Sequence, residues 1–396
     1  MSKVICIITH SHLCRNPRVL KESIALARAG YIVEIINSGY SAKLFAEDFE
    51  LIKAYNIKVQ TISDLSKNNW KSFKDRMLKK AGGWLVRYLH IENPYAIGYG
   101  VLRYLRVCKN SKADLYICHQ ELPLYVGIKL KEKGYNIAFD LEDWYSEDLL
   151  PESRKERPTS LLKEWERKAL HTGSYCTTTS QALANELSKR YSCKAPGVIY
   201  NSFSSRADLG NTKKEYSSPI KLFWFSQTIG QGRGLEGFID LLKNVTISCE
   251  LHLLGAVSKG YKNILSSSIS KPHSIFFHHL VGSDELSDFI KQFDVGLALE
   301  LKQPLSRNFT ITNKLFQYIQ AGLPVIASDT TGQREIFKNS KPGLLITNEN
   351  VTKELNSWLS DPKELSNARD TAIHLSTQYC WETQEEIFLD LVNNAL

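Results

Sequence analysis

The stretch TNKLFQYIQAGLPVIASD (residues 312–329) predicts a short helix followed by a buried strand. Gly322 is typical of the position just past a helix end, and Pro324 introduces the apolar run of the strand. Lys314 then falls in the first helical turn, where unpaired backbone amides and the positive end of the helix dipole favour an anion. The segment therefore predicts a phosphate or pyrophosphate site, with a solvated lysine on a surface helix as the alternative.

A glycine-rich turn at residues 230–234 follows another apolar run, Leu222–Phe225. Its glycines let the backbone approach a ligand closely, and Arg233 can grip phosphate oxygens with two parallel hydrogen bonds. The G-x-G-x-G spacing differs from the dinucleotide-binding pattern, and Glu250 precedes the second strand, where that pattern requires an acid after it. Two cationic helix starts at strand ends suit a diphosphate. The residues expected to bind it are Gly230, Gly232, Arg233, Thr312, Asn313 and Lys314.

The composition indicates a globular protein with two domains. The chain has 396 residues, of which 43% are hydrophobic and 23% charged, and it is long for a single core. No run approaches the ~20 apolar residues of a membrane span, and the first apolar run, Val4–Ile8, is too short for a signal peptide. Eight cysteines without a Cys-x-x-Cys pair favour reduced thiols over disulfides or a zinc site. These features predict a cytoplasmic protein.

Positive charge is concentrated in one segment. Residues 67–112 contain eleven basic and two acidic side chains. The net charge of this segment, 11 − 2 = +9, exceeds the net charge of +8 for the whole chain. Aromatic and aliphatic residues recur there at three- and four-residue steps, which favours a basic amphipathic helix on an anionic membrane surface over a nucleic-acid site. The alternative is that the apolar face packs into its own domain, and Gly82-Gly83 weakens a single continuous helix. The residues expected at the membrane are Trp70, Lys71, Lys74, Lys79 and Lys80.

Strands and helices alternate along both halves of the chain. Apolar runs such as Val4–Ile8 and Ile32–Ile36 are separated by helical patterns, and a similar series begins again at Leu222. This alternation predicts an α/β fold with two Rossmann-like parallel-sheet domains facing a cleft. The expected boundaries are 1–203 for the first domain, 204–219 for a linker, 220–377 for the second domain, and 378–396 for a C-terminal helix that packs back on the first domain.

Residues from both halves of the chain, including the two motifs above, together form a recognisable pattern. It consists of Pro17 to Val19 with Gly30, Asp114 through His119, Thr179-Ser180, Asn201, Gly230 to Gly234, Gly255, Asp294, and Asn313 through Asp329. On these residues the chain resembles the GT-B glycosyltransferases, in particular the large retaining family four, over nearly its whole length. The resemblance implies that Arg233 and Lys314 hold the diphosphate of a sugar nucleotide in the second domain. It also implies that His119 lies at the donor sugar and that the first domain binds the acceptor.

Two positions depart from that family. Its members usually have a Glu-x7-Glu pair whose second glutamate holds the ribose, but Phe309 and Gln317 occupy these positions here. Gln317 can accept one hydrogen bond from a hydroxyl and donate another, without the strength that a charge adds. An arginine that is frequent in the family is replaced by Gln227. Glu300, at the end of the run Val295–Leu299, is a candidate for contact with the donor sugar or the ribose.

Charged residues of the first half are candidates for the acceptor side. Asp140, Glu142 and Asp143 follow a predicted strand and can orient acceptor hydroxyls, and Arg18 can bind an acceptor phosphate. The alternatives are a solvated arginine for Arg18 and a satisfied core histidine for His119. No metal is expected at Asp140 and Glu142, because residues two apart in an extended segment point in opposite directions.

These expectations combine into one function. The chain is expected to be a hexosyltransferase-type glycosyltransferase that moves a sugar from a nucleotide diphosphate sugar, with UDP as the expected nucleotide, to a hydroxyl of a lipid-linked glycan. His119 and Glu300 are the candidates for catalytic positions. The setting would be surface polysaccharide synthesis (lipopolysaccharide or capsule), peripheral on the inner face of the cell membrane, with retention of configuration, no cofactor and no nucleic acid. The alternatives are a sugar-nucleotide epimerase of the same architecture and a degenerate, non-catalytic glycosyltransferase that acts as a scaffold.

Overall fold

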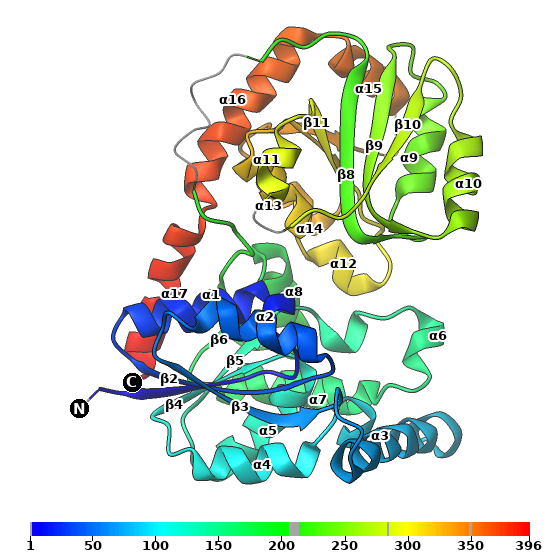
Figure 1. The fold of residues 1–396 in the computed structure, drawn as a ribbon. Coiled ribbons are helices and arrows are strands. Elements are labelled where there is room, and N and C mark those ends of the chain that lie inside the picture. The colour runs from blue at the N-terminus through cyan, green and yellow to red at the C-terminus, as the bar shows by residue number, and fades with distance from the viewer. Residues whose placement is uncertain (1, 206–213, 283–284, 348–350) are drawn as a thin grey trace. The chain divides into compact units, whose positions relative to one another are not determined.

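The computed structural model describes residues 2–205, 214–282, 285–347 and 351–396, and it divides into two compact units. Unit 1 comprises Met1–Ile199 and Glu385–Leu396, and unit 2 comprises Tyr200–Gln384. Each unit is built around one parallel sheet with helices on both faces (Figure 1). Half of the linker expected at 204–219 falls on residues 206–213, which lie outside the described residues.

The strands of the unit 1 sheet lie in the order β3-β2-β1-β4-β5-β6-β7. They are β1 (Val4–Ile8), β2 (Ile32–Gly39), β3 (Ile57–Asp64), β4 (Leu115–His119), β5 (Ile137–Leu141), β6 (Cys176–Thr178) and β7 (Gly197–Val198). The helices are α1 (Pro17–Arg28), α2 (Ala42–Ile52), α3 (Trp70–Leu89), α4 (Val101–Asn110), α5 (Glu121–Lys131), α6 (Pro151–Arg154), α7 (Thr159–Thr172) and α8 (Gln181–Tyr191), with short 3-10 turns η1 (Leu13–Arg15), η2 (Pro94–Ala96) and η3 (Tyr145–Glu147).

The core of unit 1 lies between its sheet and the covering helices. Helices α1 and α2 lie on one side of the sheet and α4 and α5 on the other (Figure 1). The strands are therefore buried on both faces, and Ile7, Ile117 and Phe139 at the centre are almost completely inaccessible. The strand order reverses between β1 and β4, and open parallel sheets bind their ligands beyond the carboxyl ends of strands at such a reversal.

The strands of the unit 2 sheet lie in the order β10-β9-β8-β11-β12-β13. They are β8 (Ile220–Ile229), β9 (Cys249–Val257), β10 (Ser274–His278), β11 (Val295–Ala298), β12 (Val325–Ser328) and β13 (Gly343–Ile346). The helices that follow β8 through β13 are α9 (Leu235–Leu242), α10 (Lys259–Ser268), α11 (Leu286–Ile290), α12 (Leu305–Phe309), α13 (Asn313–Gln320), α14 (Thr331–Phe337), α15 (Val351–Leu359), α16 (Pro362–Gln378) and α17 (Trp381–Ala395).

Unit 2 repeats the architecture of unit 1. Helices α9 and α10 cover one side of its sheet, and α11, α13 and α16 cover the other (Figure 1). All neighbouring strands are parallel, and the order reverses between β8 and β11. The expected fold class, α/β with two Rossmann-like parallel-sheet domains, is confirmed.

The C-terminal helix α17 begins in unit 2 and ends in unit 1. Its last residues belong to unit 1, where Tyr31 donates a hydrogen bond from its hydroxyl to Asn393. Asn136 Nδ2 donates to the carbonyl oxygen of Ala395 at 2.7 Å. These two contacts attach the end of the chain to the same unit as its beginning.

Two elements of unit 1 differ from the sequence-based expectations. Strand β3 was not expected, because its exposed residues, including Lys58 and Gln60, break any apolar run; its parallel pairing with β2 defines it instead. Helix α3 is continuous, so the interruption expected at Gly82-Gly83 is absent. A Cβ on Gly82 would lie 2.8 Å from the backbone nitrogen of Ala96, so the glycine is required where η2 packs against the helix.

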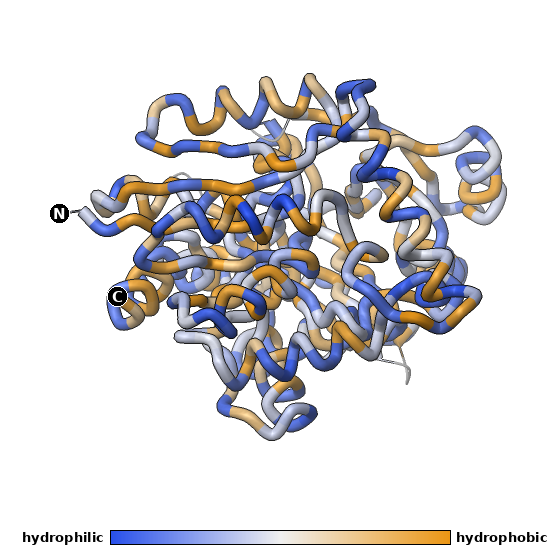
Figure 2. The backbone as a smooth tube through the Cα atoms, turned by 90° about the horizontal axis from the view of Figure 1, so that it is seen from below, coloured by the Kyte–Doolittle hydropathy of each residue, from blue (hydrophilic) through white to orange (hydrophobic). Residues whose placement is uncertain are grey.

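Hydropathy along the chain agrees with helices that cover sheets. Figure 2 shows hydrophobic and hydrophilic stretches alternating along the helical coils, as expected when one face of a helix is buried. Among the described residues, no helix combines the length and the apolar content that crossing a membrane requires.

Candidate functional site

The glycine-rich turn after β8 has the backbone shape that its sequence predicts. Gly232 and Gly234 have φ angles of +74° and +81°, in the left-handed region that glycine adopts without strain. A Cβ on Gly234 would lie 3.2 Å from the Cβ of Leu299, so the turn passes close to the end of β11. Arg307 of α12 donates from Nη1 to the carbonyl oxygen of Gly232 at 3.2 Å. The turn is thus held between β11 and α12.

Helix α13 carries Lys314 in its first turn. Thr312 is the N-cap, and its hydroxyl oxygen accepts a hydrogen bond from the Lys314 backbone N–H at 3.4 Å. Further along the helix, the Tyr318 ring fills the space beside Gly296, where a Cβ would lie 2.3 Å from the ring. The Tyr318 hydroxyl donates to the carbonyl oxygen of Phe223 at 3.0 Å. This close packing on β11 and β8 fixes where the first turn of α13 lies.

Two arginines of unit 2, Arg233 and Arg307, lie near Lys314, which pairs with Glu300. Lys314 is only 8% exposed, and its Nζ lies 3.6 Å from Glu300 Oε1 and 5.3 Å from the ring centre of Trp224. Burial lowers the pKa of Lys314; the nearby Glu300 opposes this shift, and the charges of Arg233 and Arg307 add to it. Within the described ranges, neither arginine forms an ion pair with a carboxylate. The group, hereafter the cation cluster (Arg233, Arg307 and Lys314), therefore has an excess of positive charge.

A cavity of about 960 Å³ lies beside Glu300 in unit 2. Its walls come from the start of α9 and from the segments that follow β11, β12 and β13. The lining residues include Gly234, Glu236, Gly237, Leu299, Glu300, Lys302, Ser328, Asp329, Thr330 and Arg334. Arg334 already binds both carboxylate oxygens of Asp329, at 2.6 and 2.5 Å. The cavity is within the size range of small-molecule sites, and its carboxylates can accept hydrogen bonds from hydroxyl groups.

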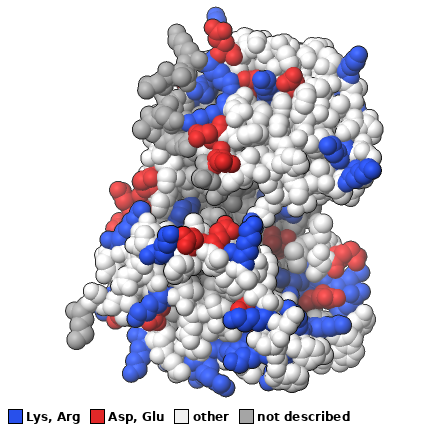
Figure 3. Space-filling view, in the orientation of Figure 1, with Lys and Arg blue, Asp and Glu red and all other residues white. Residues whose placement is uncertain are grey.

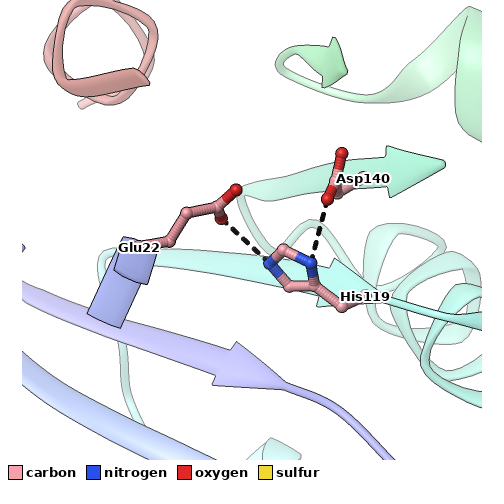
Figure 4. A group of neighbouring side chains, drawn as sticks. All are labelled: Glu22, His119 and Asp140. Atoms are coloured by element: carbon pink, nitrogen blue, oxygen red, sulfur yellow. Dashed lines mark ion pairs between the residues drawn. The ribbon is translucent and has the colours of Figure 1, made fainter. Parts of the chain in front are cut away.

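A second group of charged residues lies inside unit 1, at the carboxyl ends of β4 and β5. His119 is fully buried, with Nδ1 3.0 Å from Asp140 Oδ2 and Nε2 3.1 Å from Glu22 Oε2 (Figure 4). Arg18 of α1 donates to both oxygens of Asp140, at 2.5 and 2.8 Å, and Thr177 donates to the same carboxylate at 2.7 Å. Arg18, Glu22, His119 and Asp140 are hereafter the buried ion network.

The charges of the buried ion network stabilise one another. Burial alone would lower the pKa of His119, but Glu22, Asp140 and Glu142 outweigh it and raise this pKa well above the usual 6.5. Burial would likewise raise the pKa of Asp140, but Arg18 and His119 hold it well below its usual range. The network therefore contains a protonated histidine and an ionised aspartate in contact.

The donor atoms of Glu22, His119 and Asp140 lie within 4.8 Å of one another, which is close enough for a metal ion. Both oxygens of Asp140 are already occupied by the guanidinium of Arg18. A cation bound there would have to displace that guanidinium, so the residues present do not fit a metal ion.

Sequence and structural comparisons agree on the architecture. Residues 221–361 match the model of the family described as glycosyl transferases group 1. The chain has the GT-B fold. Sucrose-phosphate synthase (tll1590) from Thermosynechococcus elongatus superposes with a TM-score of 0.68 at 14% identity, over 99% of this chain and 98% of that one. Anabaena Alr3699/HepE, solved with UDP and glucose, gives a TM-score of 0.65 at 15% identity, over 99% of both chains.

A putative UDP-N-acetylglucosamine 2-epimerase from Listeria monocytogenes is also similar, with a TM-score of 0.55 at 12% identity, over 99% of this chain and 96% of that one. No curated protein matches the chain in sequence. At these identities the structural likeness shows the fold. The match to the model of the glycosyl transferases group 1 is confined to residues 221–361, all of which belong to unit 2.

Unit 2 brings together four of the residues expected at the donor. Gly232, Arg233, Lys314 and Glu300 lie around the cation cluster. Gly230 has open space around it, Asn313 is exposed, and Gln317 is partly exposed on α13. Sequence reasoning missed Trp224, because a tryptophan inside an apolar strand gives no sign that it will face a lysine.

In unit 1, the structure separates the predicted acceptor residues, together with His119, into two groups. Arg18, Asp140 and His119, the last of which was expected at the donor sugar, are buried and bound to one another, which favours a structural role over direct contact with a substrate. Glu142 and Asp143 are partly exposed. Glu142 accepts hydrogen bonds from Asn16 Nδ2 at 2.9 and 3.2 Å and lies 3.2 Å from His119 Nδ1.

Helix α3 is amphipathic, but its apolar face is turned outward. Trp70, Phe73, Trp84 and Tyr88 are exposed by 74%, 51%, 52% and 58%. The face in contact with unit 1 consists of small, polar or short residues instead: Ser72, Asp75, Gly82, Gly83 and Val86. The alternative in which the aromatic side chains pack into their own domain is therefore wrong.

Polar contacts hold α3 to unit 1. Asp75 accepts hydrogen bonds from Ser63 and from Arg103, and Asn93 Nδ2 donates to the carbonyl oxygen of Gly82 at 3.1 Å. Of the lysines expected at the membrane, Lys79 differs from the rest, because it is half-buried and lies over the Tyr99 ring at 5.2 Å. Lys and Arg side chains are frequent along the lower edge of unit 1 in Figure 3, where Figure 1 draws α3 and α4.

Proposed function

We propose that the protein transfers a sugar from a nucleotide diphosphate sugar to a hydroxyl of a glycan. The observation that carries the proposal is the cation cluster, which lies within the part of the chain that matches the family model and holds more positive than negative charge. Such an excess suits a diphosphate. UDP is the expected nucleotide, because a protein of the same fold was solved with UDP and glucose.

The proposed chemistry requires stabilisation of the departing diphosphate. Negative charge grows on this leaving group as the glycosidic bond breaks, and cations placed in advance lower the energy of that state. Arg233, Arg307 and Lys314 supply the positive charge, and the amides at the start of α13 add to it. The residues assigned to the donor are Gly230, Gly232, Arg233, Thr312, Asn313, Lys314 and Gln317, with Glu300 at the donor sugar.

On the acceptor side, the proposal assigns the contacts to Glu142 and Asp143. His119 then acts through Glu142, whose carboxylate it holds together with Asn16. The acceptor is a lipid-linked glycan of a surface polysaccharide, and the transferred group is a hexose moved with retention of configuration. Retention of configuration follows from the family resemblance, whereas the acceptor contacts rest on the partial exposure of Glu142 and Asp143.

The experiment is a screen of UDP-, GDP- and TDP-sugars for thermal stabilisation of the purified chain, followed by an assay of nucleotide release with lipid-linked glycan acceptors. A true donor at one hundred times its dissociation constant adds about 2.7 kcal/mol of stability. Arg233→Ala should lose this stabilisation, whereas Lys243→Ala, at the far end of α9 and exposed, should keep it. Conversion of the donor sugar without any acceptor would identify an epimerase instead. No stabilisation by any nucleotide sugar would point to a non-catalytic scaffold.

The outward apolar face of α3 supports a second part of the proposal, a peripheral position on the inner face of the cell membrane. Exposed aromatic rings can enter the boundary between headgroups and acyl chains, while Lys71, Lys74 and Lys80 contact anionic headgroups. Each such basic residue adds about 1 kcal/mol near an anionic surface. Because the helix is already formed and anchored by its other face, binding requires no folding step.

Vesicle flotation tests the membrane position. The protein should float with phosphatidylcholine vesicles that contain phosphatidylserine, and less so with phosphatidylcholine alone. Reversing the charge of Lys71, Lys74 and Lys80 together, or replacing Trp70 and Trp84 by serine, should release it. The matched control reverses Lys43, Lys53 and Lys58, which are exposed on unit 1 outside α3. Equal flotation of all variants would refute the assignment.

A further inference from the structure

Glu300 occupies an unusual position in unit 2, between the cation cluster and the cavity. Its backbone is fixed, because its N–H donates to the Ser328 hydroxyl of β12 at 3.0 Å. Its side chain reaches Lys314 in one direction and lines the cavity in the other. The torsions of the Glu300 side chain therefore decide which of the two regions receives the carboxylate.

Lys314 requires a counter-ion when no ligand is bound. Its side chain is almost completely buried, and an ammonium group that leaves water without a partner is strongly destabilised. Among the described residues, Glu300 is the carboxylate that pairs with it. The other close neighbour, the face of the Trp224 ring, attracts a cation more weakly.

The pair between Lys314 and Glu300 is a loose one. The Nζ to Oε1 distance of 3.6 Å exceeds the 2.7–2.9 Å of a charge-assisted hydrogen bond. Two further cations, Arg233 and Arg307, act on Lys314 through their charges, and among the described residues neither is paired with a carboxylate. A phosphate group, with several oxygens and fuller negative charge, can satisfy these cations better than one distant carboxylate.

We propose that Glu300 is an internal counter-ion of the phosphate site, which the diphosphate of the donor displaces from Lys314. The released carboxylate turns into the cavity that it already lines and accepts hydrogen bonds from hydroxyl groups of the donor sugar. Glu300 is thus a specificity-determining residue that opposes binding of a nucleotide alone and favours a nucleotide that carries a sugar. The inference rests on the proposed function, because it concerns the same donor site.

The test is isothermal titration calorimetry of the full chain with UDP, inorganic pyrophosphate and the donor found in the screen. Glu300→Gln should bind UDP and pyrophosphate about three- to tenfold more tightly, as expected for residues coupled in one charge network. The affinity of the same variant for the complete donor should rise less than its affinity for UDP, or fall, because the carboxylate contact to the sugar is gone. In the Lys314→Met background, Glu300→Gln should no longer change the affinity for UDP.

Two matched variants guard against indirect effects. Asp240→Asn changes an exposed carboxylate of α9 that accepts a hydrogen bond from Lys243 and is not part of the cavity lining, and it should leave UDP binding unchanged. Glu300→Asp keeps the charge on a shorter side chain and should raise the affinity for UDP by less than Glu300→Gln does. This variant also tests the inference if Glu300→Gln fails to fold. Unchanged or weaker UDP binding by the Glu300 variants would overturn the inference while leaving the function intact. Failure of the unaltered protein to bind any nucleotide diphosphate would instead remove the proposed function.

Discussion

The buried ion network of unit 1 and the cation cluster of unit 2 occupy equivalent places in two similar sheets, but their charges are balanced differently. Each lies at the carboxyl ends of strands near the point where the strand order reverses. In unit 1, Arg18 and His119 contact Glu22 and Asp140 at 2.5–3.5 Å. In unit 2, a single loose pair serves three cations. Charges that satisfy one another maintain a fold, whereas an excess of one sign is available to a ligand.

Removing one charge from the unit 1 network should have the largest effect on folding. Arg18→Met leaves Asp140 and Glu22 buried without their main cation, and breaking a buried ion pair from one side costs about 3–5 kcal/mol. Urea denaturation monitored by circular dichroism measures this loss. The control is Arg28→Met at the exposed end of α1, which should cost less than about 1 kcal/mol. A similar small loss for Arg18→Met would show that the network does not hold unit 1 together.

The same kind of change in unit 2 should affect binding instead of folding. Lys314→Met removes a buried cation and its desolvation cost, and the Glu300 carboxylate that it leaves behind can turn into the cavity that it lines, so the free energy of unfolding should change little. Affinity for UDP should fall by about 3 kcal/mol, roughly 100-fold, because a desolvated charge contact is lost. Calorimetry and urea denaturation on one preparation separate the two effects. A large loss of stability with unchanged UDP affinity would reverse the comparison between the units.

The protonation state of His119 gives a pH test of unit 1. Because the pKa of His119 in the folded protein is raised above 6.5, its stabilisation is fully present below pH 6.5 and is lost as the pH rises through the raised value. His119→Asn should therefore cost about 2 kcal/mol at pH 6 and less once the pH exceeds the raised pKa of His119. The exposed His171 on α7 provides the control, since His171→Asn should have little effect at either pH. An NMR titration in which the His119 ring loses its proton near pH 6.5 would contradict the assignment.

A carboxylate added to unit 2 should have the smallest effect of these changes. It should raise the affinity for UDP, whereas Lys314→Met lowers it. Gln317→Glu places a charged acceptor at the position where the resembling family holds the ribose. A charge-assisted hydrogen bond is stronger than a neutral one, so UDP should bind about 1 kcal/mol more tightly, roughly fivefold. Pyrophosphate, which has no ribose, should not share this gain. Equal changes for both ligands would mean that Gln317 does not face the ribose.

The sequence predicted much of the fold because its strongest signals are local. The apolar run Val4–Ile8 became a strand with the same bounds, and Gly232 and Gly234 have the φ angles that a tight turn requires. The helix start at Thr312 was likewise visible in the polar residue before an amphipathic stretch. Short-range rules on turns, caps and periodicity are sufficient for such features.

The partners of charged residues were harder to predict, because they lie far apart in the chain. Nothing around Arg18 shows that it binds Asp140, so both were assigned to the acceptor. The orientation of α3 depends on Gly82 and on the backbone of η2 beside it, which periodicity alone does not reveal. In each case the deciding contact joins segments that only the tertiary fold brings together.

The outward-facing α3 also reverses the usual pattern of mutational tolerance. In most helices on a sheet, large aromatic side chains are the least replaceable residues and glycines the most, since any other residue improves helix propensity. In α3, folding should tolerate almost any residue at Trp84, which touches little of unit 1, and almost none at Gly82, where even a methyl group meets the backbone of η2. Selection for a stable fold alone would therefore conserve Gly82 and allow substitutions at Trp84. Conservation of aromatic residues along this face would then indicate that they are needed for contact with something other than this protein.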